Sequence, residues 1–221
     1  MDTLRALELR HSVRSYTDKP ISGDTLEKLQ KLIADANKKG DVHIQLVLNE
    51  PKAFKGFLSK IGGFKNTKNY FALAAKKGKE EALGYYGMML MAEAQKLGLN
   101  TCFVAGTYSK DKNAVDLRRG EKLAAVISVG YGTDNGQPHK SAPLTSFAKL
   151  KGDEPDWFME GLRMAQYAPT AMNRQKFSFD LKKNGKVELE AKGGSAALDD
   201  GILKYSFEAG ASAKGHNVKW A

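Results

Sequence analysis

Cationic and hydroxyl side chains gather near the beginning of the sequence, in the stretch LRHSVRSYTDKPI. Arg10, Ser12 and Arg14 lie within five positions, and His11 lies between the first two. Arginine offers paired, charge-assisted donors to a phosphate and serine adds a hydroxyl, so this pattern is typical of a phosphate clamp. On a helix, Arg10 and Arg14 would share one face. A solvated basic turn on the surface is the alternative interpretation of the same residues.

A second group of polar side chains follows a predicted break in a helix, in the stretch YAPTAMNRQKFSF. The helical pattern ends at Pro169, and Thr170, Asn173 and Gln175 come before an alternating strand. Short amide and hydroxyl groups on such a loop suit hydrogen bonding to a planar heterocycle. An ordinary helix end with turn residues is the alternative.

The elements that would position these two groups follow from apolar periodicity and turn signals. Helices are predicted at residues 2–10, 22–40, 51–61, 79–100, 157–168 and 201–217, and strands at 42–49, 70–77, 101–106, 124–129 and in a hairpin at 175–191. The loop between the strand at 124–129 and the next helix contains several prolines and glycines. Helices and strands are thus mixed along the chain, which predicts an α+β fold.

Local signals indicate where several of these elements begin, turn and end. Asp24 is expected to cap the second helix, and Gly40 to end it. Asn184-Gly185 is a favoured dipeptide for the hairpin turn. The helix at 79–100 is the longest and is apolar on several sides, which predicts a position at the centre of the core.

The order of elements repeats along the chain: each half runs helix, strand, strand, long helix, Gly-X-Asn and short strand. A shift of 117 positions aligns five pairs of residues, which are Gly84 with Gly201, Ala94 with Ala211, Gly98 with Gly215, Asn100 with Asn217, and Phe103 with Trp220. The polar stretch FAKLKGDEPD separates the halves. We therefore predict a degenerate duplication, with one half over residues 1–148 and the other over 155–221.

The two polar motifs together resemble the FMN-dependent nitroreductase family. The resemblance rests on a basic-Ser-Val-Arg-x-Tyr motif followed by Pro-Ile, and on Ala-Pro-Thr-x-x-Asn-x-Gln before a strand. The stretches KLGLNTCFVAGTY and AAVISVGYG resemble the central helix and later strands of the family. The resemblance implies a nitroreductase-like α+β fold, with antiparallel-rich central sheets flanked by helices and an internal pseudo-twofold axis.

The sequence departs from the usual pattern of the family at one place. The Pro-Ser/Thr-x-x-Asn loop normally follows the first helix after the arginine motif, but here ADANKKGDVHIQLVL occupies that place. The loop occurs only in the second half, which resembles the nitroreductase subgroup with two family-like halves fused in one chain. This implies one FMN site per chain, between the halves, and loss of the symmetric site because the second half has no Arg-Ser motif.

The resemblance assigns two groups of residues to FMN. The phosphate end would contact Arg10, His11, Ser12, Arg14 and Lys140, and the isoalloxazine ring would contact Ala105, Gly106, Pro169, Thr170, Ala171 and Asn173. His139 is a further candidate beside the phosphate. Lys65 could also reach the flavin, although a solvated loop lysine is the favoured interpretation of this residue.

The activity implied by the resemblance is that of an NAD(P)H oxidoreductase. NAD(P)H would reduce FMN by hydride transfer, and a nitroaromatic, quinone or similar small-molecule acceptor would reoxidise it. This scheme requires no catalytic side chain, and the four histidines lack metal-ligand spacing. Two alternatives stay open: a non-catalytic flavin-binding or storage protein, and a basic nucleic-acid-binding module.

Composition limits the partners. The formal net charge is +10, which favours anionic ligands, but the lysines are dispersed and form no basic tail. The single cysteine, Cys102, excludes an internal disulfide and fits a reducing compartment. No stretch approaches 18 uninterrupted apolar residues. We expect a cytoplasmic protein without nucleic-acid or membrane partners, acting as a pseudo-dimeric monomer or a weak homodimer.

Overall fold

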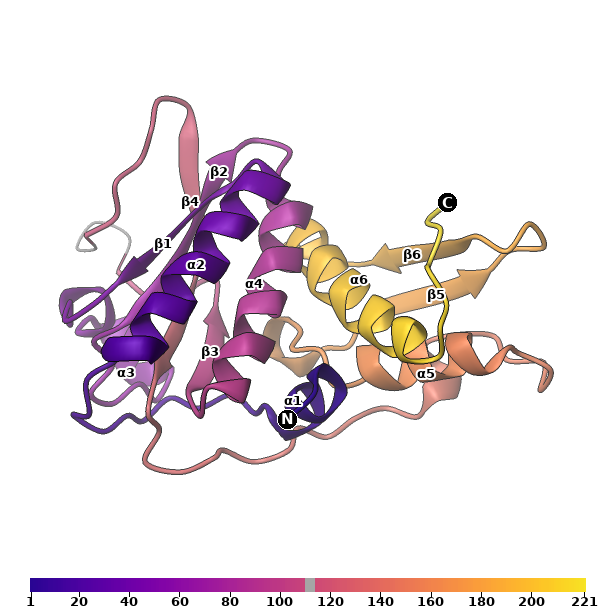
Figure 1. Ribbon diagram of the computed structural model, residues 1–221, viewed down its shortest axis with the longest axis horizontal. Coiled ribbons are helices and arrows are strands. Elements are labelled where there is room, and N and C mark those ends of the chain that lie inside the picture. Colours follow the sequence, from indigo (N-terminus) through magenta and orange to yellow (C-terminus); the bar gives the residue numbers. More distant parts are fainter. Residues whose placement is uncertain (110–113) are drawn as a thin grey trace.

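The computed structural model describes residues 1–109 and 114–221. Two sheets, each covered by helices, lie side by side, and the helices α4 (Glu80–Lys96) and α6 (Ala196–Ala213) pack against each other between them (Figure 1). We use "N-terminal half" for residues 1–148 and "C-terminal half" for residues 155–221. None of the described helices is long and apolar enough to cross a lipid bilayer.

The N-terminal half contains a four-stranded sheet in which every pair of neighbouring strands is antiparallel. Its strands, in spatial order, are β1 (His43–Val47), β2 (Tyr70–Lys76), β4 (Glu121–Gly130) and β3 (Asn100–Val104). β2 is buried from its first residue to Ala75, because both faces of the sheet are covered. The predicted strands are confirmed, and β4 begins three residues before its predicted start.

Helices of the N-terminal half follow the prediction except at residues 51–61 and at the end of the long helix, where α4 stops at Lys96 and not at residue 100. α1 spans Thr3–Leu9, and α2 spans Gly23–Gly40 on the same face of the sheet as α4 (Figure 1). The helix predicted at 51–61 is instead the 3-10 helix η1 (Lys52–Phe54) followed by the single-turn helix α3 (Phe57–Ile61). Gly56 lies between the two, in an extended conformation that ends the first and begins the second.

The predicted capping role of Asp24 is wrong. Ser22 occupies the cap position of α2, and Asp24 lies inside the first turn, where its charge still opposes the positive end of the helix dipole. At the other end, Gly40 is the last helical residue and Asp41 adopts the left-handed conformation with φ 49°. Both α2 boundaries are therefore within two residues of the predicted ones, but the cap position belongs to Ser22, whose side chain makes no capping hydrogen bond.

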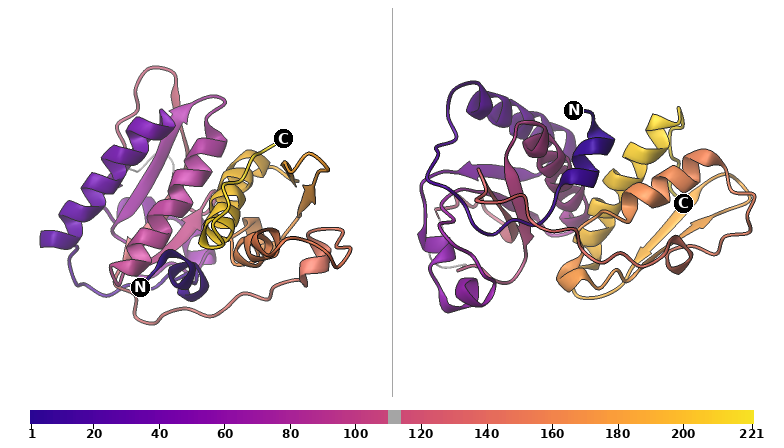
Figure 2. Two further views of the ribbon diagram at one scale, coloured as in Figure 1. Left: turned by 45° about the vertical axis from the view of Figure 1, so that its right-hand side comes forward. Right: turned by 90° about the horizontal axis from the view of Figure 1, so that it is seen from below.

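The C-terminal half is a two-stranded sheet packed against two helices (Figure 2). Its elements are α5 (Asp156–Ala165), the 3-10 helix η4 (Ala171–Asn173), β5 (Phe177–Leu181), β6 (Val187–Ala191) and α6. Gly185 forms the hairpin turn with φ 77°, as Asn184-Gly185 predicted. α6 starts at Ala196, five residues before the predicted start at Gly201, because the residues just before Gly201 are compatible with a helix.

One apolar core continues from one half into the other. Met88 and Met91 on α4 are fully buried in it, together with Phe207 on α6. Phe207 also stacks on Phe179 of β5, with ring centroids 4.8 Å apart. α4 therefore lies at the centre of the core, as its all-round apolarity predicted.

Candidate functional site

Arg10 is a buried cation whose charge has no counter-ion among the described residues. It follows α1 directly, and only 3% of the residue is exposed. Its Nη2 donates a hydrogen bond to the carbonyl of Tyr167 at 3.3 Å, while Nε and Nη1 are buried without a partner in the described part of the chain. Burial lowers the pKa of Arg10 to about 10, so the side chain stays charged at neutral pH. An unpaired buried charge is costly, so this environment favours an anionic ligand.

The residues after Arg10 form an extended segment, which corrects the expectation that Arg10 and Arg14 share a helical face. α1 ends at Leu9, and Ser12 pairs with Thr101 of β3 in a parallel bridge. In an extended chain, alternate side chains point the same way, so positions 10, 12 and 14 still share a side. Their spacing fits both geometries, which is why the sequence alone did not separate them.

Cys102 on β3 lies near enough to Arg10, Ser12 and Arg14 for all three to influence its thiol. The Ser12 hydroxyl lies within hydrogen-bonding reach of the Cys102 thiol. Burial raises the pKa of this thiol, and the charges of Arg14 and Arg10 act on it in the opposite direction. Arg14 itself is exposed, with its guanidinium carbon 6.0 Å from the ring centroid of Phe64. The charge of the buried Arg10 and the charge of the exposed Arg14 therefore both influence the Cys102 thiol.

Two histidines lie beside Arg10. Nδ1 of His11 is 3.1 Å from the carbonyl oxygen of Asn135, and Nε2 of His139 is 3.1 Å from that of Gln166. Burial lowers the pKa of His139, and the charges of Arg10 and His11 lower it further. This influence places His139 next to the arginine.

The proline-led loop is tied to the segment that carries Lys140. The carbonyl of Lys140 accepts hydrogen bonds from Nδ2 of Asn173 at 3.0 Å and from Nε2 of Gln175 at 2.7 Å. Oε1 of Gln175 accepts from the backbone of Ala142, and Oγ1 of Thr170 accepts from the backbone of Gln175. The polar side chains that the sequence assigned to a heterocycle therefore hold the loop in place.

The same loop contains strained backbone. Met172, Asn173 and Gln175 all adopt left-handed conformations, with φ between 49° and 55°. Such conformations cost free energy for residues other than glycine, and they persist where the surrounding contacts determine them. One of these contacts comes from α6, where the carboxylate of Asp199 accepts a hydrogen bond from the backbone N–H of Ala171. The loop is thus held from both sides.

Ala105 and Gly106 follow β3 directly and are exposed. A side chain added at Gly106 would meet no atom within 4 Å, so the backbone here is open to a ligand. Lys65 is also exposed, and its backbone N–H donates to the carbonyl of Arg14 at 2.9 Å. Lys65 therefore borders the segment that carries the arginines.

Several contacts that organise the site were not found in the sequence. The carbonyl of Tyr167 accepts a hydrogen bond from Arg10, and the carbonyl of Gln166 is a hydrogen-bond partner of His139. Nε2 of Gln166 donates to the carbonyl of Ala142 at 2.6 Å. Backbone carbonyls have no signature in a sequence. Gln166 and Tyr167 precede the Ala-Pro motif, and their polar character at a helix end was the only available signal.

Contacts between segments distant in sequence bring the two predicted motifs together. Arg10 contacts Tyr167 just before the proline-led loop, and Lys140 is bonded to Asn173 inside it. The connection from β4 to α5, which carries Lys140, crosses from one half to the other along the lower edge of the molecule in Figure 1. The site therefore combines the front of the chain, this connection and the loop after α5.

Similarity to known structures defines the class of fold. A nitroreductase structure from Thermotoga maritima aligns with a TM-score of 0.71 and 18% identity, over 99% of this chain and 87% of that one. A nitroreductase from Desulfovibrio desulfuricans in complex with FMN aligns with a TM-score of 0.51 and 18% identity, over 70% and 98%. A nitroreductase family protein from Clostridium difficile 630 also has a TM-score of 0.51, with 14% identity, over 70% and 100%. The fold is therefore nitroreductase-like, as the motifs predicted.

Family membership follows from the sequence itself. The family model described as "Putative TM nitroreductase" matches residues 2–211, so the chain belongs to this nitroreductase family, a family of oxidoreductases. No curated protein shows a significant match to the chain.

Proposed function

We propose that the protein is an FMN-dependent oxidoreductase of nitroreductase type. Bound FMN would supply hydride acceptance from NAD(P)H and electron donation to a nitroaromatic, quinone or similar acceptor. The observation that carries the proposal is Arg10, which is buried, charged and provided with two nitrogens that have no partner in the described part of the chain. Support also comes from the relative from Desulfovibrio desulfuricans, which is described in complex with FMN.

The residues present fit a phosphate-bearing flavin. A phosphate would give Arg10 the counter-ion that the described part of the chain does not provide, through hydrogen bonds in which both groups are charged. The hydroxyl of Ser12, the exposed guanidinium of Arg14 and the exposed ammonium of Lys140 would add donors. His139, kept neutral by burial at physiological pH, would add a hydrogen-bonding group rather than a charge.

The ring of the flavin would lie between backbone segments. Ala105 and Gly106 leave exposed backbone on the side of β3. The loop from Pro169 to Asn173 would face it from the C-terminal half, and its hydrogen bonds to Lys140 and Asp199 would keep it in one conformation. We assign no catalytic side chain, because positioning the flavin between these segments is sufficient for the proposed transfer.

The test removes the arginines. Arg10→Ala combined with Arg14→Ala is expected to abolish FMN binding and to keep the fold, because each lost charge-assisted contact costs roughly 1.5–3 kcal/mol. Fluorescence titration with FMN measures the affinity, and circular dichroism checks the fold. The matched control is Arg118→Ala with Arg119→Ala, a pair of exposed arginines before β4. Unchanged FMN affinity in the first double variant would contradict the proposal.

A second experiment separates an enzyme from a storage protein. Purified protein with FMN is expected to be yellow and to lose its colour when NADH or NADPH is added without oxygen. Colour that persists with both nucleotides would instead support flavin storage. Colourless protein that binds no FMN but shifts a nucleic-acid probe would support the nucleic-acid-binding alternative.

A further inference from the structure

α3 presents an apolar face that the rest of the described chain leaves uncovered. Phe57, Leu58 and Ile61 are 76%, 53% and 66% exposed. With 3.6 residues per turn, positions i, i+1 and i+4 fall within about 100° of one another around a helix, so the three side chains leave it on one side and form a single patch. Ser59 lies on the opposite side, where it is fully buried and donates a hydrogen bond to the carbonyl of Thr107 at 2.9 Å. The exposed face is therefore fixed outward by the way α3 is anchored.

Exposed lysines flank this patch in the sequence. Lys52, Lys55, Lys60 and Lys65 are all exposed, and none of them forms an ion pair with another described residue. Residues 51–68 contain five lysines and no acidic residue. We use "the α3 surface" for Phe57, Leu58 and Ile61 together with these four free lysines.

Two acidic groups that contact residues 51–68 are already engaged. Both carboxylate oxygens of Glu50 accept hydrogen bonds from the backbone N–H groups of Lys52 and Ala53. Asp18 forms an ion pair with Lys68, the fifth lysine of the stretch. The four free lysines therefore keep a positive field around the apolar face.

An apolar face together with free lysines favours some ligands of the α3 surface over others. Two copies of the chain meeting through this surface in a twofold contact would bring the same lysines close to each other, which opposes self-association. A nucleic acid would neutralise the lysines through its phosphates but would leave the aliphatic side chains in water. An anionic bilayer satisfies both features, because its headgroups carry negative charge and its acyl boundary accepts apolar side chains.

We propose that the α3 surface docks the protein on anionic lipid bilayers. Phe57, Leu58 and Ile61 enter the boundary between headgroups and acyl chains, and the four lysines contact the headgroups. This replaces the sequence-based expectation of no membrane partner with a peripheral contact that needs no membrane-spanning helix. The proposal does not depend on the flavin, since every group that carries it lies in residues 51–68.

Docking would place the candidate flavin site close to the bilayer. Ser59 bonds to Thr107, and the backbone of Ser109 donates to the carbonyl of Ala53 at 2.8 Å. These contacts join the α3 surface to the segment that begins at Ala105 and Gly106. An acceptor dissolved in lipid would thus have a short path to the site.

Vesicle sedimentation tests the proposal. The protein is expected to sediment with vesicles of phosphatidylcholine and phosphatidylserine, to bind pure phosphatidylcholine more weakly, and to be released by salt. Phe57→Ser with Ile61→Ser should lower binding to the anionic vesicles by about tenfold or more, because it removes most of the apolar face. The content of bound FMN, measured separately, should not change, so failure of docking and failure of flavin binding are distinguishable.

A charge-matched pair of variants separates a defined surface from net charge. Lys55→Glu with Lys60→Glu should abolish sedimentation, whereas Lys28→Glu with Lys31→Glu on the exposed side of α2 should preserve most of it. Equal losses in the two variants, or full binding by the Phe57 and Ile61 variant, would overturn the proposal. Binding to a DNA duplex that ignores Phe57 and Ile61 would assign the lysines to nucleic acid. Dimerisation that those two substitutions abolish would assign the surface to a second copy.

Discussion

At the scale of single residues, Asp199 shows how the C-terminal half holds the candidate site. It lies in the first turn of α6, and its carboxylate receives the backbone N–H of Ala171. Burial, together with the neighbouring carboxylate of Asp200, raises the pKa of Asp199 from 3.8 to about 6. The contact that fixes the loop therefore uses a carboxylate whose ionised form the fold disfavours.

This environment predicts a pH-dependent stability difference between wild type and Asp199→Asn. Because the folded pKa exceeds the unfolded one, the folded state retains a proton that the unfolded chain releases between the two values, and stability falls as the pH rises through that range. The amide introduced by the substitution would carry no charge and could still accept the Ala171 bond. The variant should therefore melt at a higher temperature than wild type at pH 8, with the difference vanishing near pH 4.

Asp35→Asn is the matched control, because Asp35 is exposed on α2 and forms no ion pair with the described residues. Its melting temperature should follow that of wild type at both pH values. If the melting temperature of Asp199→Asn follows that of wild type at both pH values, burial does not raise the pKa of Asp199.

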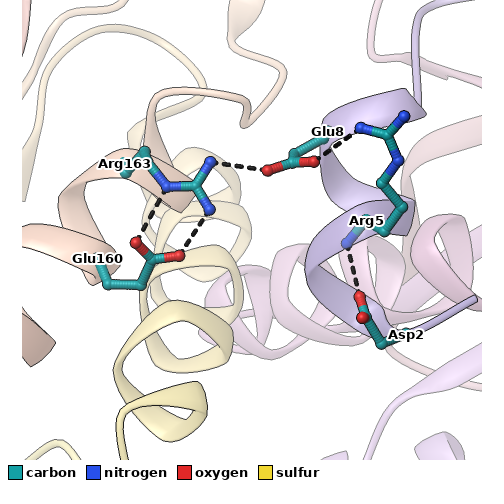
Figure 3. Close-up of polar contacts among 5 residues, drawn as sticks. All are labelled: Asp2, Arg5, Glu8, Glu160 and Arg163. Atoms are coloured by element: carbon teal, nitrogen blue, oxygen red, sulfur yellow. Dashed lines mark hydrogen bonds and ion pairs between the residues drawn. The ribbon is translucent and has the colours of Figure 1, made fainter.

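At the scale of elements, α1 and α5 are joined by an ion network that spans the two halves (Figure 3). Nη1 of Arg163 on α5 is 2.7 Å from the carboxylate of Glu8 on α1, while its Nε and Nη2 bond to both oxygens of Glu160. Hydrogen bonds from Arg163 and then Arg5 lower the pKa of Glu8. The network orients α1, and α1 leads directly into Arg10.

We predict a modest coupling across this network. In a double-mutant cycle with Glu8→Gln and Arg163→Met, the coupling free energy should be about 0.5–1 kcal/mol, because the pair is partly exposed. The lowered pKa of Glu8 means that the contribution is present above the unperturbed value of 4.5 and is lost as the pH falls through the folded pKa. Urea unfolding at pH 7 and pH 3 measures both quantities.

The cycle of Glu27→Gln with Arg163→Met is the control, since Glu27 is exposed on α2 and forms no ion pair with the described residues. Coupling there should be near zero. A coupling between Glu8 and Arg163 that persists at pH 3 would contradict an electrostatic origin.

The crossing of α4 and α6 depends on two glycines. A Cβ atom at Gly84 would lie 2.0 Å from the carbonyl oxygen of Leu198, and one at Gly201 would lie 1.9 Å from that of Glu81. Backbone atoms of packed helices cannot move aside as a flexible side chain can. Only glycine therefore permits the two helices to approach this closely.

We expect Gly84→Ala and Gly201→Ala each to destabilise the protein by about 3 kcal/mol or more, because each added methyl overlaps backbone. Gly194→Ala is the matched control, since a Cβ there meets no atom within 4 Å and φ is not positive. Chemical denaturation of the three variants measures the effect. Wild-type stability in Gly84→Ala would show that the helices do not cross as closely as described.

The elements were predictable from the sequence where one local signal dominated. Alternation found β1, β5 and β6, and Asn184-Gly185 found the hairpin turn, because each depends on neighbouring residues alone. The helix predicted at 51–61 was not found as such, since Gly56 interrupts it and Phe57, Leu58 and Ile61 face outward. In the site, the side chains of Arg10 and Asn173 were predicted but not their partners, because those partners are carbonyls from distant segments.

At the scale of the whole molecule, the contacts between α4 and α6 are reciprocal under the shift of 117 positions. Gly84 packs on Leu198 and Gly201 packs on Glu81. The shift carries Gly84 onto Gly201 and Glu81 onto Leu198, so it converts each pair into the other. The contact is thus the kind that a twofold axis generates. The sequence repeat and the close approach of α4 and α6 are therefore both related by the same shift of 117 positions.

The sheets and helix ends repeat in a similar way. Each half contains an antiparallel pair of strands before its long helix, β1 with β2 and β5 with β6, and the shift carries Ala74 of β2 onto Ala191 of β6. Two bonds that end the helices also correspond: the N–H of Leu99 donates to Ala94, and that of His216 donates to Ala211. We propose on these grounds that the two halves arose by duplication, as the sequence repeat predicted.

The proposed duplication predicts the number of flavin sites. A symmetric pair of sites would need a second Arg-Ser motif before α5, but residues 149–155 contain no arginine and include Asp153 and Glu154, whose charges repel a phosphate. Titration of the full chain with FMN should therefore saturate at one equivalent per chain, and light scattering should show that binding does not require two chains. Saturation at two equivalents, or at one per pair of chains, would mean that the second half keeps a site of its own or that the site forms between molecules. If the Arg118 and Arg119 control variant saturates with FMN as wild type does and the Arg10 and Arg14 variant does not, then the single FMN binds at the segment that contains Arg10 and Arg14.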